Sequence, residues 1–164
     1  MTAIATFDAL QREYPKARLA RHCVEVACSP KTFYDVVSDY EAYPDFVPSQ
    51  RAARVVSHEQ HGHTERFTVS MELALVKPVR YTLRSEGVPG KFLTWSLLDG
   101  DFMRENTGSW VIEELPNGMT RATFQLAVVL KGWWPKPLIN SLVNKTCPAT
   151  VRAFKIEAER RARC

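Results

Sequence analysis

Alternating apolar and polar positions dominate the middle of the chain and predict a succession of strands. In residues 65–76 every second side chain is apolar, a period-two pattern that is typical of a half-buried strand. Similar alternation recurs on either side, and short turns with Gly, Pro or Asn separate the stretches. Because consecutive strands joined by short turns pair most simply with their neighbours, we expect an antiparallel meander. The predicted strands are residues 19–27, 51–57, 65–76, 79–84, 93–97, 104–115 and 121–130.

Residues 29–48 interrupt this pattern after the first strand and predict two short helices. Ser29 can cap the free N–H groups of a helix, and Pro30 suits its first position. Apolar residues then follow at helical spacing on one face. Residues 40–46 predict a second short helix. Tyr43-Pro44 interrupts it, because a residue before proline avoids helical geometry.

The C-terminal third changes to helical periodicity. From residue 136 to residue 161 apolar side chains recur every three or four positions, with polar residues mostly on the opposite side. This pattern predicts one long helix, and Pro148 inside it predicts a kink. A shorter amphipathic pattern that includes Ile4 predicts an N-terminal helix or partly ordered arm over residues 1–18, ahead of one domain over residues 19–164.

This order of elements predicts an α+β fold in which a curved antiparallel sheet of about seven strands surrounds the long C-terminal helix. The two short helices follow the first strand. The inward side chains of such a sheet can line a cavity for an apolar ligand or fill a plain core, and periodicity alone leaves both readings open. The large inward side chains are Phe67, Met71, Tyr81, Trp95, Trp110 and Phe124.

The composition is that of an ordinary globular protein and indicates where in the cell it is expected. With 45% hydrophobic and 24% charged residues, a chain of 164 residues can bury a core without disulfides or metals. No apolar run is long enough to cross a bilayer, and Asp8 and Glu13 stand where a signal peptide would be apolar. The four cysteines form no CxxC pair, so we expect reduced thiols and a cytoplasmic location.

The net charge of +4 is small, and part of it lies in the basic cluster of residues 160–163, which is typical of a solvated helix end. On charge alone, neither a ribosome nor a nucleic acid is an expected partner. The neighbouring Trp133 and Trp134 are less usual. We expect one of them to seal the helix onto the sheet and the other to be exposed, where it could make a transient contact with a membrane surface or a partner.

Few residues offer chemistry. His58, His61 and His63 share a predicted polar turn, where solvated side chains are expected rather than a metal site. His22 lies on the apolar face of the first strand and is expected to be a hydrogen-bonded core residue, although a buried pair with Tyr81 would favour an enzyme. No Ser/His/Asp arrangement, P-loop or Gly-rich nucleotide motif is present, so no catalytic residue, metal or cofactor is predicted.

Residues 39–48, DYEAYPDFVP, resemble the D-x-x-x-Y-P-x-F-x-P signature of START-like (SRPBCC) proteins. The resemblance extends over residues 19–161 and is greatest to the polyketide cyclase/dehydrase and coenzyme Q-binding branch, which includes RatA-type ribosome-association toxins. It implies a helix-grip fold. It also implies a cavity, because members of this superfamily bind or carry lipids, quinones and other hydrophobic molecules, and a minority are enzymes.

The resulting expectation is binding or transport of a hydrophobic small molecule (a lipid, quinone or polyketide-like compound) between the sheet and the C-terminal helix. The alternatives are a polyketide cyclase/dehydrase-type enzyme and a RatA-like ribosome or protein interaction module. Tyr43 and Phe46 are candidate gate residues at the open end of the sheet. The candidate ligand-binding residues are Tyr43, Phe46, Phe67, Val69, Met71, Tyr81, Leu83, Trp95, Trp110, Phe124, Leu138, Leu142 and Phe154.

Overall fold

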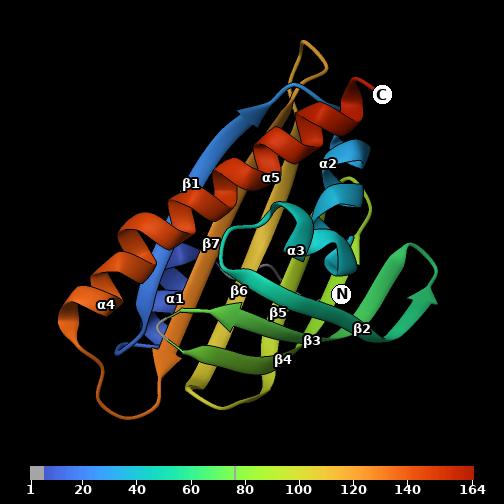
Figure 1. Ribbon diagram of the computed structural model, residues 1–164. Helices are drawn as coiled ribbons and strands as arrows, with labels where there is room; N and C mark the ends of the chain where they lie inside the picture. Colours follow the sequence, from blue (N-terminus) through green and yellow to red (C-terminus); the bar gives the residue numbers. More distant parts are fainter. Residues whose placement is uncertain (1–5, 76) are drawn as a thin grey trace.

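One curved antiparallel sheet of seven strands forms the body of the molecule (Figure 1). The computed structural model describes residues 6–75 and 77–164, so Ile4 and Val76 of the predicted elements lie outside the described residues. The strand order is β1-β7-β6-β5-β4-β3-β2, which confirms the predicted meander and places β1 beside β7. The strands are β1 (Arg18–Val26), β2 (Gln50–His61), β3 (Thr64–Ala74), β4 (Pro78–Val88), β5 (Phe92–Gly100), β6 (Met103–Glu114) and β7 (Thr120–Leu130).

The β2–β3 hairpin is longer than the alternation predicted. The sequence placed a turn at residues 58–63, but β2 continues to His61 and the turn consists of Gly62 and His63. Gly62 has a φ of 64°, which glycine adopts without strain. Residues 56–61 are exposed on both faces, so no apolar alternation marks them as a strand.

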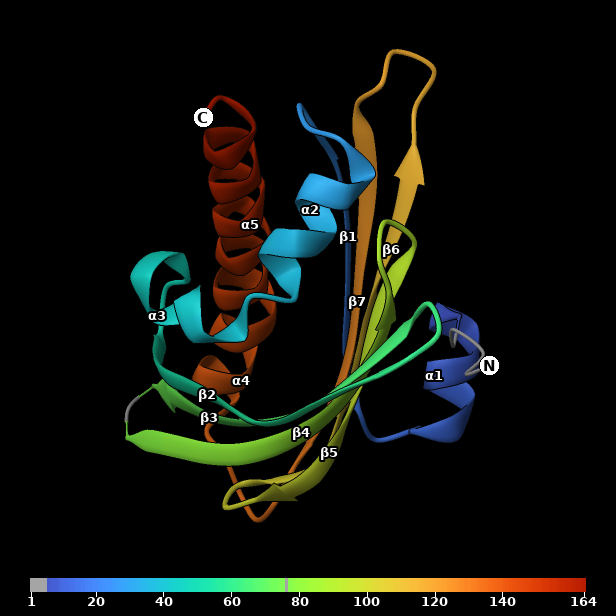
Figure 2. The ribbon, with the colours of Figure 1, turned by 90° about the vertical axis from the view of Figure 1, so that its right-hand side faces the viewer.

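Helices occupy both sides of the sheet (Figure 2). The long helix α5 (Cys147–Ala162) lies along the concave face, with α2 (Pro30–Val37) and α3 (Tyr43–Phe46) beside it. The short helix α1 (Phe7–Glu13) lies on the convex face against β1 and β7. The expected arrangement of a sheet around one long helix is therefore confirmed.

The start of α2 follows the sequence closely. Ser29 Oγ accepts a hydrogen bond from the Thr32 N–H at 3.2 Å, and Pro30 occupies the first turn. The second predicted helix begins differently, because residues 40–42 form a separate 3₁₀ turn before α3. Pro44 lies in the first turn of α3 and helps to start it. N–H groups in the first turn have no acceptor within the helix, so the missing N–H of proline costs no hydrogen bond there.

The predicted C-terminal helix consists of α4 (Lys136–Ser141), a π-helical segment (Leu142–Thr146) and α5. The irregularity expected at Pro148 thus precedes the proline. Proline has no N–H to donate four residues back, and a wider turn is one way to accommodate that loss. Neither α4 nor the π-helical segment contains a buried residue. Among the described residues, no helix is both long enough and apolar enough to cross a bilayer.

An aromatic cluster joins the two layers of the core. The Trp110 ring on β6 lies 5.1 Å from that of Phe33 on α2 and 5.5 Å from that of Phe154 on α5, between ring centroids. A second link is ionic, because Glu157 accepts a hydrogen bond from Arg161, whose guanidinium also lies 3.0 Å from Asp39. The motif at residues 39–48 is thereby tied to α5.

Candidate functional site

A cavity of about 140 Å³ remains between the concave face of the sheet and α5. Aromatic and aliphatic side chains from β3 to β7 form one wall, and residues 40–50 and the C-terminal helix close it. It contains most of the predicted ligand-binding residues. Those that line it are Tyr43, Met71, Tyr81, Leu83, Trp95, Trp110, Phe124, Leu142 and Phe154.

Two amide side chains, those of Gln50 and Asn106, belong to this mostly apolar lining. The Trp95 Nε1–H donates to Asn106 Oδ1 at 3.0 Å, while Asn106 Nδ2 has Met103 Sδ, at 3.6 Å, as its one acceptor among the described residues. Gln50 Nε2 donates to the carbonyl oxygens of Ala52 and Glu72, both at 3.0 Å. The cavity therefore offers a small number of fixed hydrogen-bonding groups, of which the Asn106 amide is the least satisfied.

Three tyrosines of the lining are fully protonated at neutral pH. Burial raises the pKa of Tyr40, Tyr43 and Tyr81 above the usual value of 10.0, although hydrogen bonds with Ser85 and Gln50 lower those of Tyr40 and Tyr81 in part. The Tyr40 hydroxyl donates to Ser85 Oγ at 2.6 Å, and that of Tyr43 donates to the backbone carbonyl of Val37. The hydrogen bonds of Tyr40 and Tyr43 hold these two rings in place beside the cavity.

The described lining of the cavity includes no His, Asp, Glu, Lys or Arg side chain. Burial raises the pKa of the Cys147 thiol to about 11, so it is neutral at physiological pH. His22 is half-buried on β1, and three strands separate it in the sheet from β4, which holds Tyr81. The arrangement thus supplies apolar contact and hydrogen bonds, and its phenol and thiol groups have pKa values raised by burial.

The other predicted residues lie outside this cavity. Val69 is fully buried in the core, and Phe46 packs edge-on against Phe154 at 5.4 Å between ring centroids. Phe67 contacts the rings of Tyr40 and His58. Leu138 belongs to a second chamber, described next.

An outer chamber of about 290 Å³ adjoins the cavity at the end of the sheet where α4 lies. Met103, Leu142 and Thr146 line both spaces, so the two share a wall. Leu138 on α4 and Trp134 in the preceding loop form its outer side. The helix α4, which contains no buried residue, therefore borders the chamber that adjoins the cavity.

A family model described as polyketide cyclase/dehydrase and lipid transport matches residues 26–155, which is most of the chain. The chain belongs to this family. The ribosome association toxin RatA of Pseudomonas aeruginosa is 26% identical over 124 residues, which cover 76% of this chain and 83% of that protein.

Two solved structures show the same fold. The Zhui aromatase/cyclase from Streptomyces sp. R1128 matches with a TM-score of 0.74 at 18% identity, covering 88% of this chain and 95% of that one. A START superfamily protein from Mycobacterium smegmatis also matches with a TM-score of 0.74, at 21% identity, covering 87% and 98%. At these identities the likeness establishes the fold of this polyketide cyclase/dehydrase and lipid transport family member, and not its ligand.

A larger hollow of this family member lies outside the inner cavity and has a more polar lining. It measures about 660 Å³ and lies on the convex side, bordered by Leu10 of α1 and by Ser57 and Glu59 of β2. Hydroxyl and charged side chains dominate its floor, and an ion pair joins Arg66 and Glu86 across it at 3.2 Å. Its lining is about equally polar and apolar, whereas that of the inner cavity is mostly apolar, so the smaller inner cavity is the candidate site for an apolar ligand.

The histidines of the β2–β3 hairpin have separate carboxylate neighbours. His58 Nε2 lies 2.9 Å from Glu65 Oε2 and its ring stacks on Phe67, whereas His61 Nε2 lies 3.2 Å from Glu59 Oε2. Within the described part of the chain, no three His, Cys, Asp or Glu side chains converge as a metal site.

Sequence reasoning missed several residues of the lining. Asn106 and Trp110 occupy alternate positions of β6, so a period-two reading extended backwards from Trp110 would have found Asn106. Gln50 has no such signal, because it lies at the first position of its strand. The other lining residues absent from the predicted set are Tyr40, Val47, Pro48, Leu73, Met103, Leu126, Val128, Thr146, Cys147 and Thr150.

Proposed function

We propose that the protein binds a hydrophobic small molecule in the cavity between the sheet and α5. The observation that carries this proposal is the lining, which combines aromatic and aliphatic walls with a few fixed hydrogen-bonding groups. That combination is typical of small-molecule sites. The family description, which names lipid transport, points the same way.

The two chambers suggest how such a ligand is arranged. The inner volume of about 140 Å³ is close to that of an engineered cavity that accepts benzene, which is about 150 Å³. A ring fits there, and a longer apolar substituent would extend past Met103 and Leu142 into the outer chamber. A ring with an apolar tail, as in a quinone or a lipid-like polyketide, matches this shape.

The hydrogen bonding favours a ligand with a carbonyl group. Among the described residues, Asn106 Nδ2 has only a thioether acceptor, which is weak, so a ligand carbonyl would improve its hydrogen bonding. The Asn106 carbonyl is already occupied by Trp95. We therefore propose the amide N–H₂ of Asn106 as the polar contact of the ligand.

Binding without catalysis is the form of the proposal that the lining supports best. Cyclisation of a polyketide requires a general acid or base beside the substrate, and the described lining supplies neutral phenols and amides instead. A cyclase remains the second candidate because the Zhui aromatase/cyclase has the same fold. We place the protein in the cytoplasm, in keeping with its unpaired thiols.

Duroquinone and its hydrocarbon counterpart durene are suitable probes, because they share one methylated ring and differ in the carbonyl groups. Titration calorimetry is expected to give tighter binding of duroquinone. Asn106→Leu should reduce that preference by about tenfold, the effect of one hydrogen bond. Loss of the preference with durene binding retained would identify the amide as the polar contact.

Leu126→Trp places an indole in the cavity and is expected to abolish binding of both probes. The matched control is Ile156→Trp, which adds the same indole to α5 where the side chain is 58% exposed. The proposal is wrong if the unmodified protein binds neither probe, or if Leu126→Trp binds them as well as Ile156→Trp does.

A further inference from the structure

The loop between β7 and α4 presents an exposed tryptophan. The Trp133 side chain is 86% exposed, the highest value among the large apolar residues that the structure describes as exposed. Large aromatic rings are usually well buried in a domain of this kind, so the exposure requires an explanation. Gly132, with a φ of 75°, turns the chain just before it.

The neighbouring Trp134, Phe102 and Lys77 contact one another and form what we call the platform beside Trp133. Trp134 Nε1 donates to the Lys131 carbonyl at 2.9 Å, and its ring meets that of Phe102 edge-on at 5.7 Å. Lys77 Nζ lies 3.9 Å from the centre of the Phe102 ring. Trp134 is thus the tryptophan that seals the loop, and Trp133 is the exposed one.

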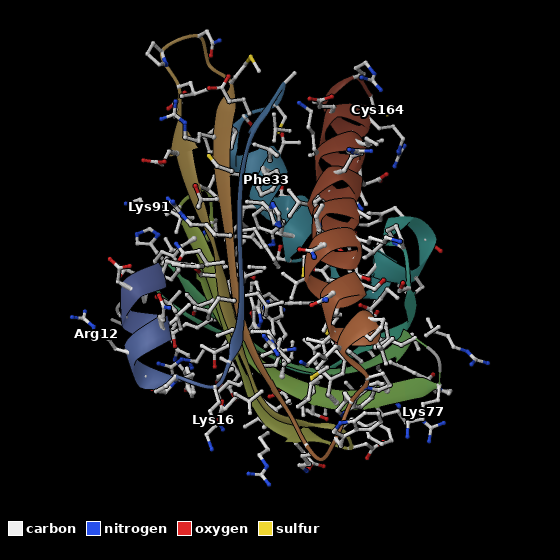
Figure 3. The ribbon with its side chains drawn as sticks, turned by 90° about the vertical axis from the view of Figure 1, so that its left-hand side faces the viewer. Arg12, Lys16, Phe33, Lys77, Lys91 and Cys164 are labelled. Atoms are coloured by element: carbon white, nitrogen blue, oxygen red, sulfur yellow. The ribbon has the colours of Figure 1, made fainter. Side chains whose placement is uncertain are left out.

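Basic residues flank this tryptophan in sequence and lie at the same end of the molecule, and Lys131 Nζ donates to the Gly100 carbonyl at 2.8 Å. Lys131 and Lys136 flank Trp133 in sequence, and Figure 3 places Lys16 and Lys77 at the same end of the molecule. Arg18 also belongs to this end, because it pairs with Val128 near the close of β7. We call Trp133, Lys77, Lys131 and Lys136 the Trp133 face. Asp99 and Asp101 are the acidic residues beside Gly100, whose carbonyl accepts the hydrogen bond from Lys131.

The outer chamber reaches the surface beside this face. Trp134, Phe102 and Leu138 line the chamber, and the first two also belong to the platform beside Trp133. The helix α4 borders it without a buried residue of its own, and a π-helical segment separates α4 from α5. An element with so few buried contacts can open at low cost in free energy.

We propose that the Trp133 face docks on the surface of an anionic lipid bilayer, with the outer chamber facing the lipid. This inference rests on the proposed function, since docking there would let an apolar ligand pass between the bilayer and the cavity without crossing water. Tryptophan favours the interface between headgroups and acyl chains, and each nearby lysine adds attraction to anionic lipid. An RNA partner would require a broader basic surface and would leave the chamber mouth without a role.

Vesicle flotation tests the proposal, with vesicles of phosphatidylcholine alone and of phosphatidylcholine mixed with phosphatidylglycerol. The protein is expected to float with the mixed vesicles only, and added salt should weaken the association. Trp133→Ala should lower partitioning by about tenfold, because it removes the inserted ring. Lys136→Glu should lower it by about fivefold or more, through the change in charge.

Ile156→Ala is the matched control, because it removes an exposed apolar side chain from α5 and should leave partitioning unchanged. No flotation of the unmodified protein, or equal flotation of Trp133→Ala, would overturn the proposal. Binding to ribosomes or RNA that depends on Trp133, without vesicle binding, would also overturn it. Duroquinone titration in buffer separates the two proposals, since Trp133→Ala should bind the probe normally whatever the vesicles show.

Discussion

The buried hydrogen bond between Tyr40 and Ser85 allows a quantitative test of how the signature motif is attached to the sheet. The two hydroxyls lie 2.6 Å apart, and the side chains are 3% and 0% exposed. Tyr40→Phe leaves the Ser85 hydroxyl buried without its partner, and Ser85→Ala does the same to Tyr40. Each single change is expected to lower the free energy of unfolding by about 1–3 kcal/mol, the desolvation cost of an unpaired polar group.

The double variant distinguishes this mechanism from a general loss of packing. With both hydroxyls removed, no polar group is left unsatisfied, so the combined loss should be smaller than the two single losses together. A coupling energy of about 1–2 kcal/mol is expected for side chains in direct contact. In a domain of this size, about 2 kcal/mol corresponds to a fall in Tm of roughly 4–8 °C.

Urea denaturation followed by circular dichroism measures these losses, provided that the m-values stay constant. Tyr34→Phe is the matched control, because the Tyr34 hydroxyl is buried and makes no hydrogen bond of good geometry among the described residues, with the Glu65 carboxylate as its polar neighbour. Removal of that hydroxyl should be neutral or stabilising. Strict additivity of Tyr40→Phe and Ser85→Ala, or a loss in Tyr34→Phe as large as theirs, would refute the reasoning.

Three further outcomes are expected. Gly108→Ala would place a methyl group 2.4 Å from the Trp95 ring, so the free energy of unfolding should fall by about 1–3 kcal/mol; an unchanged urea midpoint would contradict this. A hydrogen bond from Arg160 helps to hold the pKa of Glu157 at about 2, below its usual 4.5, so the carboxylate stabilises the fold above about pH 4.5 and that contribution is lost as the pH falls towards 2. Glu157→Gln should therefore flatten the acid limb of the stability profile, and an identical limb would count against it. Because burial raises the pKa of Cys147 to about 11, iodoacetamide should alkylate this thiol far more slowly than the exposed thiols, and equal rates by peptide mass mapping would argue for an open cavity.

The sheet could be predicted from the sequence because its inner face is consistently apolar. Met71 on β3 pairs directly with Tyr81 on β4, and both were placed inward by alternation alone. The predicted extent of β2 was too short, because its outer half has no buried face. Both faces of β2 beyond Val55 are solvent-exposed, so hydrogen bonding to β3 continues without an apolar pattern to reveal it.

The candidate site could be predicted only in part, for a different physical reason. Alternation tells which face a side chain is on, and it correctly placed Tyr81, Trp95 and Phe124 inward. It does not tell whether inward side chains fill the space between sheet and helix, because that depends on rotamers and on the distance of α5. Asn106 shares the inward parity of Trp110, but spacing alone does not show that a buried amide there is satisfied, because that depends on its hydrogen bond with Trp95.

The difference between the two ends of the C-terminal helix follows from where its apolar residues fall. In α5 the buried side chains include Val151, Phe154 and Ala158, which fix the helix against the core. In α4 no side chain is buried, and the π-helical segment interrupts the regular backbone hydrogen bonding between the two. Opening at α4 therefore disrupts little of the core, whereas displacement of α5 would expose the aromatic cluster around Phe154. The inner wall of the cavity is thus well buried and the outer one is not, so changes in α5 should act mainly on stability and changes in α4 mainly on the exchange of the proposed ligand.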